Sequence, residues 1–506
     1  MALGGPGYRG GRVSGERDPD FERLSCSLDQ DREIFHCDVW NSVVHVLALW
    51  EAGALEGGVA GRLVEGLVEV LREGPDALPG EAEDVHEAIE VRLRDLVGEE
   101  AGWLQLGRSR NDQVATSVRV RLRERLADAV SELLRLGEAL VGRGRELAGV
   151  RVAGYTHLKR AQPCSLGFWL SSYVPEVVRG ARALLRVPGL EECPLGCSAF
   201  SGSTVRVDRH REAALLGFRR PARHCGEATG LRGPVLEALG RLATVASGLS
   251  RLASDLIQLA SDEVGVVEPP DELSSTSSVM PHKKNPDALE LVRAELTVVA
   301  GLKGLGDGVH GKLPLFYNRD LQVLNGLLWD ALDRFELSVR VLRKVVEGLE
   351  VDEERARETV EGSHAVAVDL AEFLADVAGL TFRGAHRVVG RVSARLEREG
   401  VPMSRECADR VAEELRREGV EVDVGELREV LDPERAVERP VEGSTDPGRL
   451  GSTLRRLEGE LRGVRRVLVD RVRRWRRALR ATEAALGRWG VEGFVEAYER
   501  YWRPGA

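Results

Sequence analysis

One stretch of this sequence, residues 277–287, gathers groups that could stabilise and move charge. It contains the hydroxyl of Ser277, the ammonium group of Lys283 and the carboxamide of Asn285. Asn is a good N-cap and Pro suits the first helical turn, so the Asn-Pro-Asp sequence at 285–287 predicts that a helix begins there. Free backbone N–H groups at such a helix start attract anions. The stretch therefore predicts a site for a substrate that carries carboxylates.

Four further clusters combine cationic, amide or imidazole side chains with turn residues. Arg side chains bind carboxylates through two parallel hydrogen bonds, which again fits an acidic substrate. Taken one at a time, each cluster is explained as readily by helix capping or by a structural histidine. The clusters are 107–113 with Arg110 and Asn111, 154–163 with Thr156 and His157, 83–86 with His86, and 313–322 with Tyr317 and Gln322.

Most of the remaining sequence has the periodicity of long amphipathic helices. Between residues 234 and 262, leucines and a valine recur at spacings of three and four, which is typical of a seam in a helical bundle. Three more stretches behave similarly, at 113–147, 289–305 and 321–349. Helices of this length exceed the usual mean of about 11–12 residues, so we expect an elongated bundle and oligomerisation through it.

We expect an all-α fold with three mostly helical domains, of which the central one is a long-helix bundle. The end of the chain is rich in Arg and Trp and reads as a peripheral helix or an interface arm. The expected divisions are a flexible extension at 1–20, an N-terminal helical domain at 21–111, the bundle at 112–361, a small helical domain at 362–462 and a helical extension at 463–506.

The composition argues against several classes of protein. The 506 residues include 82 acidic and 72 basic ones, and the net charge of -10 argues against nucleic acid or an anionic membrane as a partner. Seven scattered cysteines form no paired metal-binding motif, so we expect reduced thiols in a cytoplasmic protein and no metal site. No apolar run approaches the roughly 18 residues of a membrane span.

In their order along the chain and in their residue sequences, these motifs resemble those of the argininosuccinate lyase family of the fumarase/aspartase superfamily. The superfamily loop motif, roughly G-S-S-x-M-P-x-K-x-N-P, corresponds to residues 276–286. The run Gly-Arg-Ser-Arg-Asn-Asp-Gln-Val-Ala-Thr at 107–116 and the run Gly-Tyr-Thr-His at 154–157 are more specific to argininosuccinate lyases. The resemblance extends from about residue 21 to residue 450. It implies the helical superfamily fold and a homotetramer whose active sites combine clusters from different subunits.

The resemblance also implies an activity, the reversible cleavage of argininosuccinate to arginine and fumarate through a dianionic aci-carboxylate. It implies Ser277 as the base, with Lys283 and backbone N–H groups stabilising its alkoxide, and His157 as the group that protonates the leaving guanidine. The reverse assignment of these two residues stays open, and no metal or organic cofactor is implied. The implied substrate-binding residues are Arg110, Asn111, Thr156 and Asn285 for the succinate carboxylates, with Ser27, His86, Tyr317 and Gln322 completing the set.

The sequence departs from the family pattern at several positions. Thr276 stands where Gly is usual, and Asn325 replaces a lysine that family members use on the substrate. Gln105 and Leu106 replace a His-Thr pair, and Ser117 replaces an Asp. The change at 325 bears on which substrate is held more than on the elimination chemistry.

Two alternatives therefore stay open. One is another fumarate-releasing lyase of the superfamily, acting on adenylosuccinate, aspartate or malate, against which the wording of 107–116 argues. The other is a non-catalytic structural protein of the crystallin kind. The joint presence of Ser277, Lys283, Asn285 and His157 argues against that second alternative.

Overall fold

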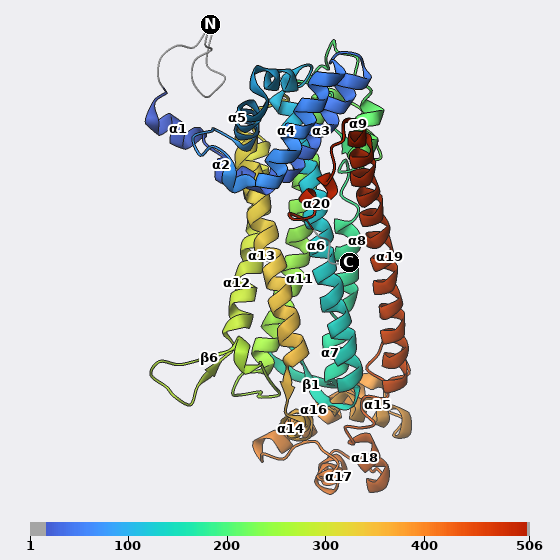
Figure 1. Ribbon diagram of the computed structural model, residues 1–506. Helices are drawn as coiled ribbons and strands as arrows, with labels where there is room; N and C mark the ends of the chain where they lie inside the picture. Colours follow the sequence, from blue (N-terminus) through green and yellow to red (C-terminus); the bar gives the residue numbers. More distant parts are fainter. Residues whose placement is uncertain (1–16, 503–506) are drawn as a thin grey trace.

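A computed structural model describes residues 17–502 as an elongated bundle of long helices with a helical region at each end (Figure 1). The predicted all-α fold class is confirmed, since the strands are short and pair only two by two. Within the described residues, every helix is too short or too polar to span a lipid bilayer. The main helices of the bundle are α6 (Arg110–Glu146), α8 (Val174–Leu184), α11 (Gly233–Leu259), α12 (Asp287–His310), α13 (Asp320–Gly348) and α19 (Pro447–Leu486).

The leucine seam predicted between 234 and 262 forms α11, and its apolar residues are all buried. This helix packs against α12 and α13, which run alongside it through the middle of the molecule. The helix α6 begins with a capping box, in which the Ser109 hydroxyl and the Asp112 carboxylate each accept a backbone N–H from the other end of the first turn. That cap fixes where the chain turns into the bundle.

The helix cap predicted at Asn285 lies one residue before the cap that the structure shows. The helix α12 begins at Asp287, with Pro286 in the N-cap position, and Asn285 lies in the short strand β7 (Lys284–Asn285). That strand pairs antiparallel with β6 (Ser275–Thr276). The residue before a proline is pushed toward extended backbone, because the proline ring clashes with its N–H and Cβ in the helical region. Asn285 is therefore extended and pairs with Ser275, one residue before the N-cap position.

The N-terminal helices pack across one end of the bundle, at the top of Figure 1. Their buried residues belong to the same apolar core as those of the bundle, so this region is continuous with the long helices. Its elements are α1 (Pro19–Ser25), α2 (Leu28–Asp31), η1 (Arg32–Ile34), α3 (Phe35–Glu51), α4 (Gly57–Glu73), η2 (Pro75–Ala77), α5 (Val85–Val97) and η3 (Gly98–Gln105). Beside it lie β3 (Glu192–Cys193), α9 (Arg209–Leu215), β4 (Arg220–Pro221) and α10 (Cys225–Gly230).

The opposite end carries a β-hairpin and a small helical domain with a core of its own. The small domain buries Leu370, Val392 and Leu415 among others, separately from the main core. Its helices are α15 (Ala367–Val377), α16 (Phe382–Arg398), α17 (Ala408–Arg417) and α18 (Val424–Val430). The hairpin is β1 (Arg151–Thr156) with β2 (Lys159–Ser165), and nearby lie α7 (Leu166–Ser171), α14 (Glu353–Glu361) and the pair β5 (Val267–Glu268) and β8 (Glu350–Val351).

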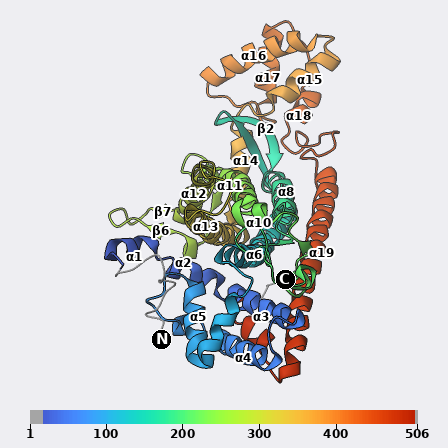
Figure 2. The same ribbon diagram turned by 90° about the horizontal axis from the view of Figure 1, so that it is seen from above.

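The last part of the chain returns along the whole bundle as α19 and then folds back as α20 (Phe494–Tyr498). The boundary expected at 462/463 lies inside α19, which packs on α6 and α8. In both views α19 lies on the side of the bundle opposite α12 (Figures 1 and 2). Trp475 and Trp502 are buried in the main core, so this segment is not the peripheral arm that the sequence analysis expected.

Candidate functional site

The first group of predicted site residues surrounds a cavity of about 470 Å³ at the top end of the bundle. The N-terminus of α6 supplies Arg110 and Asn111, and the segment entering α13 supplies Tyr317 and Gln322. Two charged residues that the sequence analysis did not single out by role, Asp84 and Arg319, also line it. The cavity is therefore polar and mixes both signs of charge.

The start of α6 is held rigidly on the cavity wall. The Asn111 carboxamide donates to the backbone oxygen of Ala199 at 3.1 Å, and the Arg110 guanidinium pairs with Asp84. The buried Asp112 carboxylate accepts backbone N–H groups from Ser109 at 2.9 Å and Ser198 at 2.7 Å. Burial raises the pKa of Asp112 to about 6, and those two N–H groups oppose the shift. These contacts fix the position of the first turn of α6.

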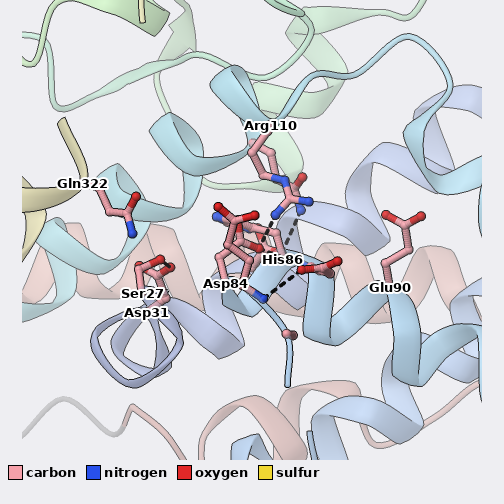
Figure 3. A network of polar contacts seen from close by, with 12 residues as sticks. Ser27, Asp31, Asp84, His86, Glu90, Arg110 and Gln322 are labelled. Atoms are coloured by element: carbon pink, nitrogen blue, oxygen red, sulfur yellow. Dashed lines mark hydrogen bonds and ion pairs between the residues drawn. The ribbon is translucent and has the colours of Figure 1, made fainter. Parts of the chain in front are cut away.

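Below the cavity, His86 belongs to a buried polar network (Figure 3). Its Nδ1 lies 2.9 Å from a carboxylate oxygen of Asp38, which also accepts the Ser117 hydroxyl at 2.8 Å and the Gln113 amide at 2.8 Å. Burial alone would lower the pKa of His86, but the Asp38 carboxylate outweighs burial and raises it. His86 thus braces the first turns of α6, and direct contact with substrate stays a prediction.

Ser27 and Gln322 face each other from the N-terminal region and from α13 (Figure 3). The Ser27 hydroxyl donates to Asp31 at 2.5 Å, and the Gln322 amide donates to the backbone oxygen of Ser25 at 3.2 Å. Burial raises the pKa of Asp31 to about 6, against the opposing influence of His86 and the Ser27 hydroxyl. Burial likewise raises the pKa of the Tyr317 phenol. Tyr317 and Gln322 line the cavity, and Ser27 and Asp31 lie behind Gln322.

Thr156 and His157 lie at the exposed tip of the β1–β2 hairpin, which is at the lower end of the bundle in Figure 1, above the small helical domain. His157 and Leu158 both have left-handed backbone, with φ of 53° and 58°. A tight type I′ hairpin turn requires this conformation at both central positions, but it favours Asn-Gly there. Each non-glycine residue in that region costs roughly 1–2 kcal/mol, a kind of strain that clusters at functional sites.

Ser277 and Lys283 lie in a third place, the loop between β6 and β7 that projects from the start of α12 (Figure 1). The Ser277 hydroxyl oxygen accepts backbone N–H groups from Val279 at 3.3 Å and Met280 at 3.0 Å. Two such donors stabilise negative charge on that oxygen, which is what an alkoxide base needs. Lys283 is exposed, whereas its neighbour Lys284 forms ion pairs with Glu268 and Asp271.

A single chain keeps these three groups apart. The 24 residues of α12 separate the Ser277 loop from the segment that carries Tyr317, and a helix of that length is about 36 Å long. The hairpin with His157 lies at the same end as the loop, away from the cavity (Figure 1). The structure therefore brings together Ser27, Arg110, Asn111, Tyr317 and Gln322, but it does not bring Ser277 or His157 to them.

The positions that depart from the family pattern have distinct structural roles. Ser117 is part of the Asp38 network, and Gln105 lines the cavity and donates to Glu90 at 3.1 Å. Asn325 is 4 % exposed in α13, and its side-chain oxygen is buried without a hydrogen-bond partner. The sequence analysis did not single out Asp38, and it therefore missed the bracing network.

Comparisons with known proteins extend over nearly the whole chain. A family model described as lyase matches residues 11–301, and one described as argininosuccinate lyase C-terminal matches residues 364–438. The chain is 75 % identical over 502 residues to the argininosuccinate lyase of Methanopyrus kandleri, covering 99 % of each, and 40 % identical over 413 residues to that of Thermus thermophilus, covering 80 % of this chain and 88 % of the relative.

Solved structures of lyases also resemble this chain over most of its length. The chain resembles an EDDS lyase in complex with formate, with a TM-score of 0.82 and 25 % sequence identity over 96 % of this chain and 98 % of that one. A fumarate lyase:delta crystallin from Brucella melitensis bound to cobalt has a TM-score of 0.67 at 21 % identity, covering 81 % of this chain and 92 % of that one. That second likeness concerns the fold alone.

Proposed function

The chain belongs to the argininosuccinate lyase family, and on that premise we propose that it catalyses the reversible elimination of fumarate from argininosuccinate to give arginine. The observation that carries the proposal is 75 % identity to a curated relative of that name over 99 % of both chains. The residues the reaction needs are present at the matching motifs, among them Ser277, His157 and Lys283. A cytoplasmic location stays a prediction.

The elimination requires removal of a carbon-bound proton next to a carboxylate. Ser277 is the proposed base, and the N–H groups of Val279 and Met280 that point at its oxygen support that role because they stabilise the alkoxide. The resulting dianionic aci-carboxylate needs fixed positive groups and N–H donors around it, and Lys283 and Asn285 are the proposed donors from this loop. His157 would then give a proton to the departing guanidine nitrogen.

The succinate carboxylates are proposed to lie against Arg110, Asn111, Thr156 and Asn285. In this chain the Arg110 guanidinium pairs with Asp84, so a substrate carboxylate would compete with that side chain for it. Tyr317 and Gln322 line the cavity, and together with Ser27 they are the proposed partners of the arginine half. His86 supports the start of α6, which carries Arg110 and Asn111, through Asp38.

Shared active sites in a homotetramer are part of the proposal. Separation of the Ser277 loop from the cavity by the length of α12 supports it, since residues of one reaction must meet within a few ångströms. A neighbouring copy would carry its loop to the cavity of the first. Symmetric assembly of identical chains gives every site the same composition.

Fumarate release, followed by ultraviolet absorbance, tests the substrate. Argininosuccinate, adenylosuccinate and aspartate are offered separately to the purified enzyme, and turnover is expected with argininosuccinate alone. Turnover with either of the other two, and none with argininosuccinate, would overturn the assignment. No turnover with any of them would favour the crystallin-like alternative.

Subunit mixing tests the shared site. Ser277→Ala and Asn111→Ala are each expected to be inactive, and the two are dissociated together and allowed to reassemble. Roughly a quarter of wild-type activity should return, because each variant chain supplies the group that the other lacks in a symmetric assembly. Reassembled tetramers without any recovered activity would mean that one chain supplies both groups to its own site.

A further inference from the structure

A second polar cluster, remote from the cavity, lies where α3, α6 and α20 meet. His36, Cys37 and Glu124 are 3 %, 0 % and 1 % exposed, so they are buried in the main core. The His36 Nε2 atom is 3.0 Å from Glu124 Oε2 and 3.3 Å from Cys37 Sγ, and the sulfur is 3.7 Å from the same carboxylate oxygen. Among residues 17–502, this is the one group of three such side chains whose ligand atoms all lie within 4.8 Å of one another.

These separations match those expected around a tetrahedral zinc ion. With bond lengths of about 2.0–2.1 Å to nitrogen and oxygen and about 2.3 Å to sulfur, tetrahedral ligand atoms lie about 3.4 Å apart for nitrogen and oxygen and about 3.6 Å apart for pairs with sulfur. The observed distances of 3.0, 3.3 and 3.7 Å differ from these by a few tenths of an ångström. Imidazole, thiolate and carboxylate are all ligands that zinc accepts.

Neighbouring side chains hold the three groups in place. The Tyr498 phenol donates to the other oxygen of Glu124 at 2.6 Å, and the Tyr501 ring stacks on His36 at 5.5 Å between ring centres. Such outer contacts orient metal ligands and fix the carboxylate oxygen that faces the ion.

The charges around the cluster also suit a doubly charged cation. One thiolate and one carboxylate would neutralise a divalent ion, so that no net charge is left in the core. The Arg121 guanidinium donates to the same Glu124 oxygen, Oε2, at 3.3 Å, and the Glu33 carboxylate, 2.8 Å from Arg121, balances its charge.

We propose that His36, Cys37 and Glu124 form a structural site for a divalent transition-metal ion of the zinc class. The ion would join α3 and α6, and Tyr498 of α20 would position the carboxylate. Binding displaces the thiol proton of Cys37 to solvent and involves no change of oxidation state. Glu124 lies fourteen residues after Arg110 on α6, about 21 Å away along the helix, so the ion is remote from the cavity.

Cysteine spacing cannot reveal such a site, because its ligands include a single cysteine and come from two segments that are far apart in the sequence. The sequence analysis expected no metal because it looked for closely spaced cysteine pairs. Hydrogen bonds among the same atoms are the competing explanation for the cluster. The two explanations differ in whether the native chain retains an ion.

Metal content of the full-length protein decides between them. The chain is expressed in medium with added zinc, exposed to a chelator that strips surface-bound metal, and analysed by mass spectrometry for zinc per chain. We expect about one zinc per chain in the wild type, because an enclosed ion is protected from the chelator. Cys37→Ala and His36→Ala should retain none, whereas Cys193→Ala, which alters another buried cysteine outside the cluster, should retain the wild-type amount.

Cobalt gives a readout on the wild-type chain, which does not depend on whether a variant folds. Wild-type chain refolded with Co²⁺ should show the intense visible bands of a tetrahedral ion together with a sulfur-to-cobalt charge-transfer band, and Cys37→Ser should lose the latter. Wild-type chain without retained zinc and without these bands would overturn the proposal. Equal zinc retention in Cys37→Ala and the wild type would identify the bound metal as adventitious and would overturn it too.

Discussion

The two ends of the bundle differ in how completely they are built within one chain. At the cavity end, His86, Asp38, Gln113 and Ser117 are buried and bonded to one another, and they hold the start of α6 in place. At the loop end, Lys283 and His157 are exposed, and few contacts fix the loop beyond the Ser277 turn and one short strand pair. The difference teaches that the cavity end is preorganised within one chain whereas the loop end is not, which is the asymmetry that the proposed shared active site requires.

The largest expected effect comes from removing the Ser277 hydroxyl, the proposed base at the loop end. Ser277→Ala should lower the rate of fumarate formation by about 10²–10⁴-fold, the usual contribution of a positioned proton-transfer group. Its neighbour Ser278→Ala is the matched control and should stay near the wild-type rate. Sedimentation should give the same assembly for both variants. An unchanged rate in Ser277→Ala would remove this hydroxyl from the mechanism.

At the cavity end, the largest effect should fall on stability. Asp38→Ala breaks a buried ion pair with His86 and leaves Ser117 and Gln113 without the carboxylate that they share, which costs about 3–5 kcal/mol of unfolding free energy. The measurement is urea unfolding at one fixed protein concentration. Asp76→Ala, which breaks an exposed pair with Arg32, should cost at most about 1 kcal/mol. Equal losses in the two variants would mean that the network is not the rigid element described.

The pH dependence of the unfolding free energy should also distinguish the cavity end from the loop end. The pKa of Asp31 is about 6 when folded, against 3.8 ordinarily, so the folded state binds the extra proton between those values. The wild type should therefore lose stability as the pH rises from about 4 to 6, by up to about 2–3 kcal/mol relative to Asp31→Asn. Parallel curves for the two proteins in that window would contradict the assignment.

The smallest effect should come from the ion pairs of the loop end. Lys284→Ala removes its exposed contacts with Asp271 at 2.7 Å and Glu268 at 2.9 Å, and surface pairs contribute about 0–1 kcal/mol. The thermal midpoint should stay close to that of the wild type. A loss as large as that of Asp38→Ala would show that this end is as firmly built as the other.

The sequence predicted the long helices well because their apolar spacing reports one buried face directly. It placed the cap at Asn285, one residue early, because cap preference carries no information on the pairing of Asn285 with Ser275. The motifs predicted candidate site residues one by one, but they carry no distances, so the separation of Ser277 from Arg110 required the length and direction of α12. The buried partners of His86 lay in another motif altogether and were not predictable by spacing.

The closing contacts of the C-terminal segment bear on the order in which the molecule is made. The indole of Trp40 donates to Thr482 at 3.1 Å, and Glu124 accepts a hydrogen bond from the phenol of Tyr498. Residues from the end of the chain therefore cover helices from its beginning. A ribosome releases the early helices first. Their apolar faces therefore stay open until translation is almost finished, and a product that stops short of residue 482 would be left with that seam unsealed, as a substrate for chaperones and proteases.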